Sequence, residues 1–230
     1  RTNSLGLIKL YNHISNLEFT TRLVHISTPE VYGNIRKETK ENKNYNPTTP
    51  YAASRITAEH FLDLLSTQNK INYCSVRASN VYGEHQKLYR IIPKTIFSIL
   101  SKSKLTLHGG GQSKRNFIHI DDVSSAIYSV MIKGKRGNCY HISGKDLISI
   151  KNLVQKICKK MNYQFKDLIR NSSERKGKDK YYSLSSAKIK KQLNWQQKIS
   201  LDNGIEKCIN WIKKNKNYYK KNDLVYVHKK

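Results

Sequence analysis

Short apolar strand patterns alternate with amphipathic helix patterns along this chain, and this alternation constrains the fold more than any other feature. The strand patterns lie at residues 22–27, 73–79, 104–108, 116–120 and 138–143. The helical patterns lie at residues 4–14, 51–65, 91–101, 121–132, 149–161, 185–193 and 200–215. Because parallel strands need a crossover connection, which is usually a helix, this order predicts βαβ units. We therefore expect an α/β protein with a parallel sheet.

The chain is strongly basic, with 43 Lys and Arg against 16 Asp and Glu and a formal net charge of +27. Such an excess favours a polyanionic partner such as nucleic acid. The lysines are, however, spread along the whole sequence among Asn, Ile and Tyr, which is typical of a solvated surface. We therefore expect no specific nucleic-acid partner, and a basic nucleic-acid binder stays an alternative. A small anion such as a pyrophosphate would also benefit from the positive charge.

Cysteine spacing and hydropathy bear on the cellular compartment. The four cysteines lie far apart without C-x-x-C spacing, so neither a zinc site nor a disulfide framework is indicated, and no metal ligand is predicted. No apolar run of about eighteen residues occurs, and the first residues lack the charged-then-apolar design of a signal peptide. These features predict a soluble, cytoplasmic chain without a membrane partner.

The stretch PTTPYAASR places a tyrosine and an arginine four positions apart near a helix start. Thr49 is a suitable N-cap, and Pro50 suits the first helical position. Residues four apart lie on one helix face about 6 Å apart, so Tyr51 and Arg55 can approach a common site. A nearby cation favours the phenolate form of tyrosine, which makes Tyr51 a candidate general base. The alternative is a surface tyrosine beside a surface cation, because this spacing also occurs by chance.

A second polar group follows the strand pattern at residues 22–27. The segment HISTPEVYG carries an apolar strand directly into Ser27, Thr28 and Glu30. In a parallel sheet, ligands bind in the crevice beyond the carboxyl ends of the strands. Hydroxyl and carboxylate groups at this point are therefore well placed for a site, although they are also ordinary loop residues.

Five segments follow one another in a specific order: HISTPEVYG, PYAASR, RASNVYG, LHGGGQSKRNFIHIDDV and YSLSSAKIKKQLNW. Together they resemble the extended short-chain dehydrogenase/reductases, and among these the nucleotide-sugar epimerases and dehydratases, with the dTDP-glucose 4,6-dehydratases as the nearest branch. HISTPEVYG resembles the family's catalytic strand and loop, and PYAASR resembles its Y-x-x-x-K helix. RASNVYG resembles the strand end near nicotinamide and sugar. LHGGGQSKRNFIHIDDV resembles a glycine turn with a phosphate-binding arginine, and YSLSSAKIKKQLNW resembles a C-terminal segment. The resemblance extends to about Lys214.

The resemblance implies a Rossmann-like doubly wound parallel sheet, NAD as cofactor and a nucleotide-diphosphate sugar as substrate. Residues 1–82 would form the C-terminal half of the NAD-binding Rossmann domain. Residues 83–230 would form mostly a smaller, mainly helical substrate-binding domain, with roughly 117–142 folding back on the Rossmann domain. The family's G-x-x-G-x-x-G turn, which holds the dinucleotide pyrophosphate, does not occur in the 230 residues. The sequence therefore looks N-terminally truncated, and we expect it to bind NAD weakly by itself.

The resemblance also assigns roles to individual residues. Tyr51 would take the proton of the sugar 4-hydroxyl, Thr28 would hydrogen-bond that hydroxyl, and Glu30 would handle the C5 proton. Arg55 would hold the nicotinamide ribose and keep Tyr51 acidic. The implied cofactor contacts are Tyr51, Arg55, Ser27 and Val81, and the implied substrate contacts are Asn80, Arg90, Leu107, His108, Arg115, Arg175 and Asp179.

Two departures from the family pattern bear on the reaction. Arg55 stands where the family usually has lysine, although its permanent charge can still supply a positive field. Pro29 stands where the glucose dehydratases have an aspartate that protonates the departing water. Glu30 would then have to serve as both base and acid.

The sequence predicts an NAD-dependent nucleotide-sugar 4,6-dehydratase, a lyase that makes a 4-keto-6-deoxy sugar nucleotide for deoxysugar or surface-polysaccharide synthesis. A nucleotide-sugar 4-epimerase, a UDP-glucuronate decarboxylase and a non-catalytic nucleotide-binding relative stay open as alternatives. Enzymes of this resemblance commonly pair through two helices, one of which would be the Tyr51 helix. We therefore expect a homodimer.

Overall fold

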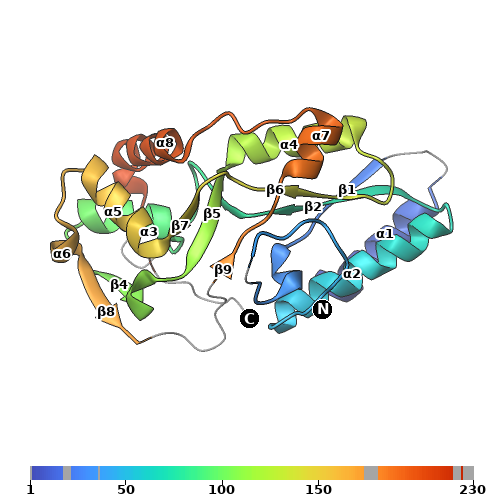
Figure 1. Ribbon diagram of the computed structural model, residues 1–230, viewed down its shortest axis with the longest axis horizontal. Helices are drawn as coiled ribbons and strands as arrows, with labels where there is room; N and C mark the ends of the chain where they lie inside the picture. Colours follow the sequence, from blue (N-terminus) through green and yellow to red (C-terminus); the bar gives the residue numbers. More distant parts are fainter. Residues whose placement is uncertain (1, 18–21, 36, 174–180, 220–223, 225–230) are drawn as a thin grey trace.

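The computed structural model describes residues 2–17, 22–35, 37–173, 181–219 and 224, and it confirms the α/β class (Figure 1). The helices are α1 (Leu7–Ser15), α2 (Pro50–Thr67), α3 (Ile91–Leu100), α4 (Ile120–Lys133), α5 (Ile150–Lys160), α6 (Phe165–Leu168), α7 (Ala187–Leu193) and α8 (Leu201–Lys214). The strands are β1 (Arg22–Ile26), β2 (Asn72–Ala78), β3 (Asn80–Tyr82), β4 (Leu105–His108), β5 (Lys114–His119), β6 (Cys139–Ile142), β7 (Leu147–Ser149), β8 (Ile169–Ser172) and β9 (Tyr181–Tyr182). A π-helical turn, η1 (Thr2–Gly6), and the 3₁₀ turns η2 (Pro29–Tyr32), η3 (Gly109–Gly111) and η4 (Lys216–Tyr218) complete the elements.

A three-stranded parallel sheet in the order β1-β2-β6 forms one half of the molecule. The five central residues of β2 are buried, as expected for a parallel strand covered on both faces. Helices α1 and α2 lie on one face of this sheet and α4 and α7 on the other (Figure 1). Two apolar clusters fill these layers, one with α1 and α2 and one with α4 and α7. The sheet therefore has the doubly wound arrangement that the sequence predicts.

The other half of the molecule is built around β5 and the helices α3, α5 and α8 (Figure 1). Strand β5 pairs in parallel with β3 and β9 and antiparallel with β7, and β4 pairs in parallel with β8. The largest apolar cluster lies between these strands and the three helices, as amphipathic helix patterns require. The domain boundary at residue 82 stays a prediction.

Local sequence explains the two elements that shape the site. Helix α2 begins at Pro50 because the Thr49 hydroxyl accepts a hydrogen bond from the Ala52 N–H at 3.1 Å. The 3₁₀ turn η2 ends at Gly33, whose φ of +63° belongs to the left-handed region that favours glycine. A Cβ at Gly33 would also collide with the Asn46 carbonyl. The glycine therefore lets the chain pass closely beneath the segment that leads into α2.

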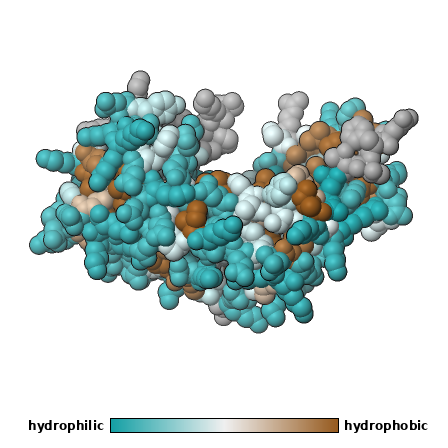
Figure 2. Space-filling model, turned by 90° about the horizontal axis from the view of Figure 1, so that it is seen from above, coloured by the Kyte–Doolittle hydropathy of each residue, from teal (hydrophilic) through white to brown (hydrophobic). Residues whose placement is uncertain are grey.

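Most of the face that carries α4, α7 and α8 is hydrophilic, and a notch separates the two halves of the molecule (Figure 2). In the ranges that the structure describes, no helix is both long enough and apolar enough to cross a lipid bilayer. All four cysteines, Cys74, Cys139, Cys158 and Cys208, are free thiols.

Candidate active site

A cavity of about 620 Å³ lies beyond the carboxyl ends of β1 and β2, where parallel sheets bind ligands. Its wall combines the loop after β1, the end of β2, strand β3, the first turns of α2 and α3, and β5. Seven of the predicted site residues line it: Thr28, Glu30, Tyr51, Asn80, Val81, Arg90 and Arg115. They come from segments up to 87 positions apart, so only the fold brings them together.

The loop after β1 presents a hydroxyl and a carboxyl group to this cavity. Thr28 is buried and caps η2, because its Oγ1 accepts a hydrogen bond from the Glu30 N–H at 3.3 Å. Pro29 occupies the first position of the turn, where the absence of an N–H costs nothing. The cap therefore fixes the relative positions of Thr28 and Glu30.

Tyr51 lies in the first turn of α2, lines the cavity and is 46% exposed. Arg55, one turn further on, does not line the cavity among the described residues. Its guanidinium donates to the Ile26 carbonyl, and its Nη2 lies 3.4 Å from Nε2 of His25. The helix thus brings Arg55 to the end of β1, and its role toward Tyr51 stays a prediction.

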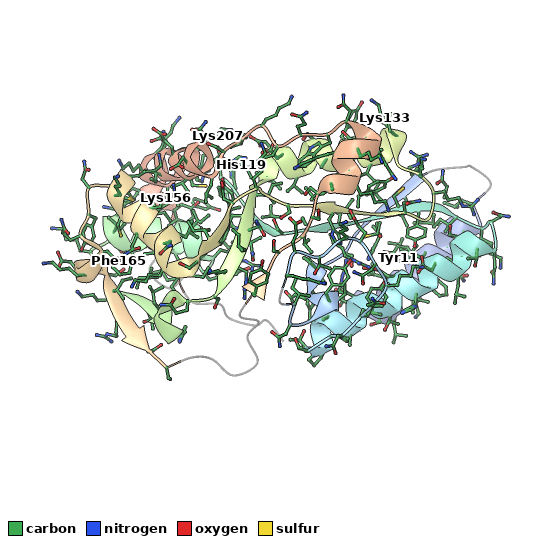
Figure 3. All side chains as sticks on the ribbon, viewed as in Figure 1. Tyr11, His119, Lys133, Lys156, Phe165 and Lys207 are labelled. Carbon is green, nitrogen blue, oxygen red and sulfur yellow. The ribbon has the colours of Figure 1, made fainter. Side chains whose placement is uncertain are left out.

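His25 is a buried neighbour of Arg55. Burial and then the Arg55 charge lower its pKa to about 4, so the imidazole is neutral at pH 7. Its Nδ1 lies 2.6 Å from the hydroxyl of Tyr11, which Figure 3 labels beside α1 and α2. Burial raises the pKa of Tyr11 to about 12, so this phenol is neutral too. Two uncharged rings, Tyr11 and His25, therefore pack in sequence next to the Arg55 guanidinium.

The cavity is also lined by residues with amide and guanidinium groups. Asn80 donates from Nδ2 to the Asn116 carbonyl at 3.2 Å, which holds the end of β3 against β5. Arg90 occupies the N-cap position of α3 without a side-chain cap hydrogen bond, and its Cζ lies 5.5 Å from the ring centroid of Tyr89. Arg115 donates from Nη1 to the Lys114 carbonyl at 2.8 Å. Two guanidinium groups in one cavity suit a doubly charged anion such as a diphosphate.

Three further residues named in the sequence, Ser27, Leu107 and His108, lie outside the cavity lining. Ser27 donates a hydrogen bond to the Glu59 carboxylate, away from the cavity lining. Leu107 is buried in the apolar cluster around α3, α5 and α8, and His108 Nδ1 lies 2.7 Å from Ser172 Oγ. Neither lines the cavity. Arg175 and Asp179 lie outside the described residues.

The structure also adds a lining residue that the sequence did not single out. Ser79, 4% exposed, lines the cavity, and its Oγ has no hydrogen-bond partner within the described ranges. A buried hydroxyl normally finds a partner, so this atom marks a place for a ligand group. Its position at the end of a strand pattern, directly before Asn80, is the sequence feature from which Ser79 could have been predicted to reach the site. Among the described residues, no group of three His, Cys, Asp or Glu side chains could hold a metal ion.

Comparison with known proteins places the chain. The family model for GDP-mannose 4,6 dehydratase matches residues 1–208. The chain belongs to this family. This result confirms the resemblance that the five ordered motifs indicated.

Two known proteins show how far the similarity to this chain extends. The human dTDP-D-glucose 4,6-dehydratase is 35% identical over 201 residues, which cover 84% of this chain and 57% of the human protein. The crystal structure of the Streptomyces venezuelae dTDP-glucose 4,6-dehydratase, with NAD and TYD bound, is 28% identical, with a TM-score of 0.89 over 95% of this chain and 67% of that one. The chain therefore spans less than two thirds of the length of its curated relative.

A third protein shares the fold. The UDP-glucuronic acid 4-epimerase of Bacillus cereus, solved with UDP-glucuronic acid and NAD, is 23% identical, with a TM-score of 0.86 over 92% of this chain and 67% of that one. At this identity the likeness shows the Rossmann-like fold alone.

Proposed function

We propose that the full-length protein is an NAD-dependent nucleotide-sugar 4,6-dehydratase of the dTDP-glucose 4,6-dehydratase type. The observation that carries this proposal is the single cavity that collects the hydroxyl residue Thr28, the carboxyl residue Glu30 and the phenol residue Tyr51 beside two arginines. The similarity to dTDP-glucose 4,6-dehydratases from human and Streptomyces venezuelae supports the same reaction.

The cavity wall fits the nicotinamide end of NAD. The buried Ser79 Oγ offers one hydrogen-bond donor and acceptor to an amide group, and Val81 adds apolar surface beside it. Tyr51, Arg55 and Ser27 complete the residues that we assign to the cofactor side, although the Ser27 hydroxyl itself donates to Glu59. When bound, NAD accepts a hydride from the sugar and returns it. We assign residues 1–82 to the cofactor domain and most of 83–230 to the substrate domain.

The residues of the chain then move protons. Tyr51 accepts the proton of the sugar 4-hydroxyl. Thr28 uses an acceptor lone pair for the Glu30 N–H, which leaves its O–H to donate to the same sugar oxygen. Glu30 takes the proton from C5 and gives it to the hydroxyl that leaves C6 as water. This double role follows from Pro29, which has no proton to give. When hydride returns to C6, C5 regains one proton, which balances the proton that Tyr51 took from the 4-hydroxyl.

The two arginines set the substrate class. Arg90, directly before α3, and Arg115, on β5, both line the cavity. Guanidinium groups can pair bidentately with phosphate oxygens, so they favour a nucleoside diphosphate over an uncharged sugar.

A 4-epimerase is the second candidate, and Pro29 is the observation that favours it. Glu30 is the single carboxyl group among the described residues that line the cavity. Inversion at C4 needs no acid for a departing water, so this set of residues is sufficient for epimerisation as well. The fold shared with the Bacillus cereus 4-epimerase is compatible with this alternative.

The product separates the two functions. Full-length protein is incubated with NAD and, in parallel, with dTDP-glucose, GDP-mannose and UDP-glucuronate, and the products are measured by mass spectrometry and NMR. We expect a product that has lost one water and carries a keto group at C4. A product of unchanged mass with inverted C4 would make the protein an epimerase, and no product from any substrate would refute catalysis on these compounds.

We further propose that the protein works in the cytoplasm as a homodimer and supplies deoxysugars for polysaccharide synthesis. Its free thiols support a reducing compartment. Exposed leucines on the face of η1, α1 and α2, namely Leu5, Leu10 and Leu64, support a dimer through these helices. Light scattering on the full-length protein tests the dimer, and a monomeric mass would contradict it.

A further inference from the structure

A buried ion pair joins β2 to α2 behind the cavity. Arg77 of β2 is 1% exposed and Glu59 of α2 is 3% exposed. The guanidinium donates from Nε to Glu59 Oε1 at 3.2 Å and from Nη2 to Glu59 Oε2. Its other hydrogen bonds go to the Tyr32 hydroxyl, the Asn42 carbonyl at 3.3 Å and the Tyr45 hydroxyl at 2.9 Å. Each guanidinium nitrogen therefore donates within the protein, as expected for a structural ion pair.

The Glu59 carboxylate also holds two hydroxyl groups from different segments. Ser27 Oγ donates to Oε1, and the Tyr45 hydroxyl donates to Oε2 at 3.1 Å. Ser27 directly precedes Thr28, whereas Tyr45 belongs to the connection that leads into α2 and does not line the cavity. Glu59 itself lies two helical turns after Tyr51. One carboxylate thus links the loop of Thr28 to the helix of Tyr51.

Electrostatics keep this carboxylate ionised. Burial acts to raise the pKa of Glu59, but the hydrogen bond and charge of Arg77, followed by the Ser27 hydrogen bond, outweigh burial and lower the pKa. An ionised carboxylate accepts charge-assisted hydrogen bonds, which are about twice as strong as neutral ones. The link between Ser27 and Glu59 is therefore stronger than an ordinary contact between a loop and a helix.

We propose that Glu59 is a positioning residue for the reaction, acting through Ser27. It holds the loop that carries Thr28 and Glu30 at a fixed place relative to the helix that carries Tyr51. The cavity depends on this placement because Thr28 and Glu30 come from one segment and Tyr51 from another, with 20 residues of chain between Glu30 and Tyr51. This inference rests on the proposed function, but its structural part can be measured without turnover.

The test compares two hydroxyl deletions on the same carboxylate. Ser27→Ala removes the donor that belongs to the catalytic loop, and Tyr45→Phe removes the donor that does not. Both variants keep the ion pair, whereas Glu59 variants risk unfolding because they break a buried pair. Both are made in the full-length protein, and Ser27→Thr, which retains an Oγ donor, serves as the rescue.

Hydrogen exchange measured by mass spectrometry reports how often the backbone amides of the loop after β1 open to solvent. In Ser27→Ala we expect the amides of residues 30–33 to exchange about tenfold faster, because one charge-assisted hydrogen bond is lost. In Tyr45→Phe and Ser27→Thr these amides should exchange as in the unchanged protein. Equal exchange of residues 30–33 in Ser27→Ala and Tyr45→Phe would overturn the proposal.

Kinetics provide the second readout. Ser27→Ala should lower kcat about tenfold with KM within about twofold, while Tyr45→Phe keeps both constants and the two variants melt at similar temperatures. Unchanged kcat in Ser27→Ala, or an equal loss in Tyr45→Phe, would overturn the positioning role. An unmodified protein that turns over none of the sugar nucleotides would refute the proposed function instead, and the exchange result would still decide the link.

Discussion

Replacing Arg77 by methionine is the sharpest perturbation of the buried ion pair. Methionine keeps much of the side-chain bulk but leaves Glu59, 3% exposed, without its guanidinium partner. Removing one member of a buried pair costs about 3–5 kcal/mol, because the remaining charge stays in a poorly solvated site. The Ser27 and Tyr45 hydroxyls still donate to the carboxylate, so we expect a loss near the lower end, about 3 kcal/mol. A stability of about 5–15 kcal/mol would fall by a large fraction.

The double variant Glu59→Gln with Arg77→Met measures how much of the loss of stability comes from the unpaired charge of Glu59. The glutamine keeps an oxygen that can accept from Ser27 and Tyr45, but it carries no charge that must be buried. We expect it to regain about 2 kcal/mol relative to Arg77→Met, because a neutral pair avoids the desolvation cost. The assay is urea unfolding of the full-length protein, followed by circular dichroism. A loss below about 1 kcal/mol in Arg77→Met, or a double variant less stable than the single one, would refute the reasoning.

The pH dependence of stability tests the direction in which folding shifts the pKa of Glu59. In the unchanged protein the pKa of Glu59 is lowered on folding, so its contribution to stability is present above the unfolded value of about 4.3 and is lost as pH falls through the lower folded value. In Arg77→Met, burial acts without the guanidinium and raises the folded pKa above about 4.3. That variant should therefore gain stability relative to the unchanged protein as pH falls from 7 toward the unfolded value. A difference in free energy of unfolding between the unchanged protein and Arg77→Met that stays constant with pH would contradict these pKa directions.

Three further outcomes follow from the structure. Tyr51→Phe should lower kcat at least about 100-fold without changing stability, because the ring is half exposed and only the hydroxyl is lost, whereas Tyr128→Phe on α4 should be neutral. Arg115→Ala should weaken binding of the nucleotide sugar about 10- to 100-fold in calorimetry, against no change for Arg136→Ala, which bonds Ser66 on the surface. Thr49→Ala should cost about 1 kcal/mol in urea unfolding through loss of the N-cap of α2, with Thr57→Ala on the same helix as the control.

Periodicity was enough to predict the parallel sheet and the long helices, because strands such as β2 and helices such as α5 bury whole faces. The residues that follow β1 could also be predicted to reach the site, since a strand end fixes where the next residues lie. The strands β3, β7 and β9 were missed because two or three residues carry too little periodicity to separate a strand from a loop, and the four-residue strand β8 was missed as well.

Contacts between distant residues could not be predicted from the sequence. Helical spacing places Tyr51 and Arg55 on one face, but the long arginine side chain reaches the Ile26 carbonyl. An arginine within the strand pattern YCSVRAS signals a buried charge, yet its partner Glu59 lies 18 positions away on a helix. The carry-over of Leu107 and His108 as substrate contacts relied on motif position alone, and neither lines the cavity in the described part of the chain.

The most direct test of the central claim is a crystal structure of the full-length protein with NAD and the sugar nucleotide that it turns over. We predict that the Tyr51 hydroxyl oxygen lies about 2.6–3.2 Å from the sugar 4-oxygen. The Glu30 carboxyl group should face C5 from the same cavity. A sugar bound outside this cavity, or a Tyr51 ring turned to solvent beside a bound sugar, would contradict the account.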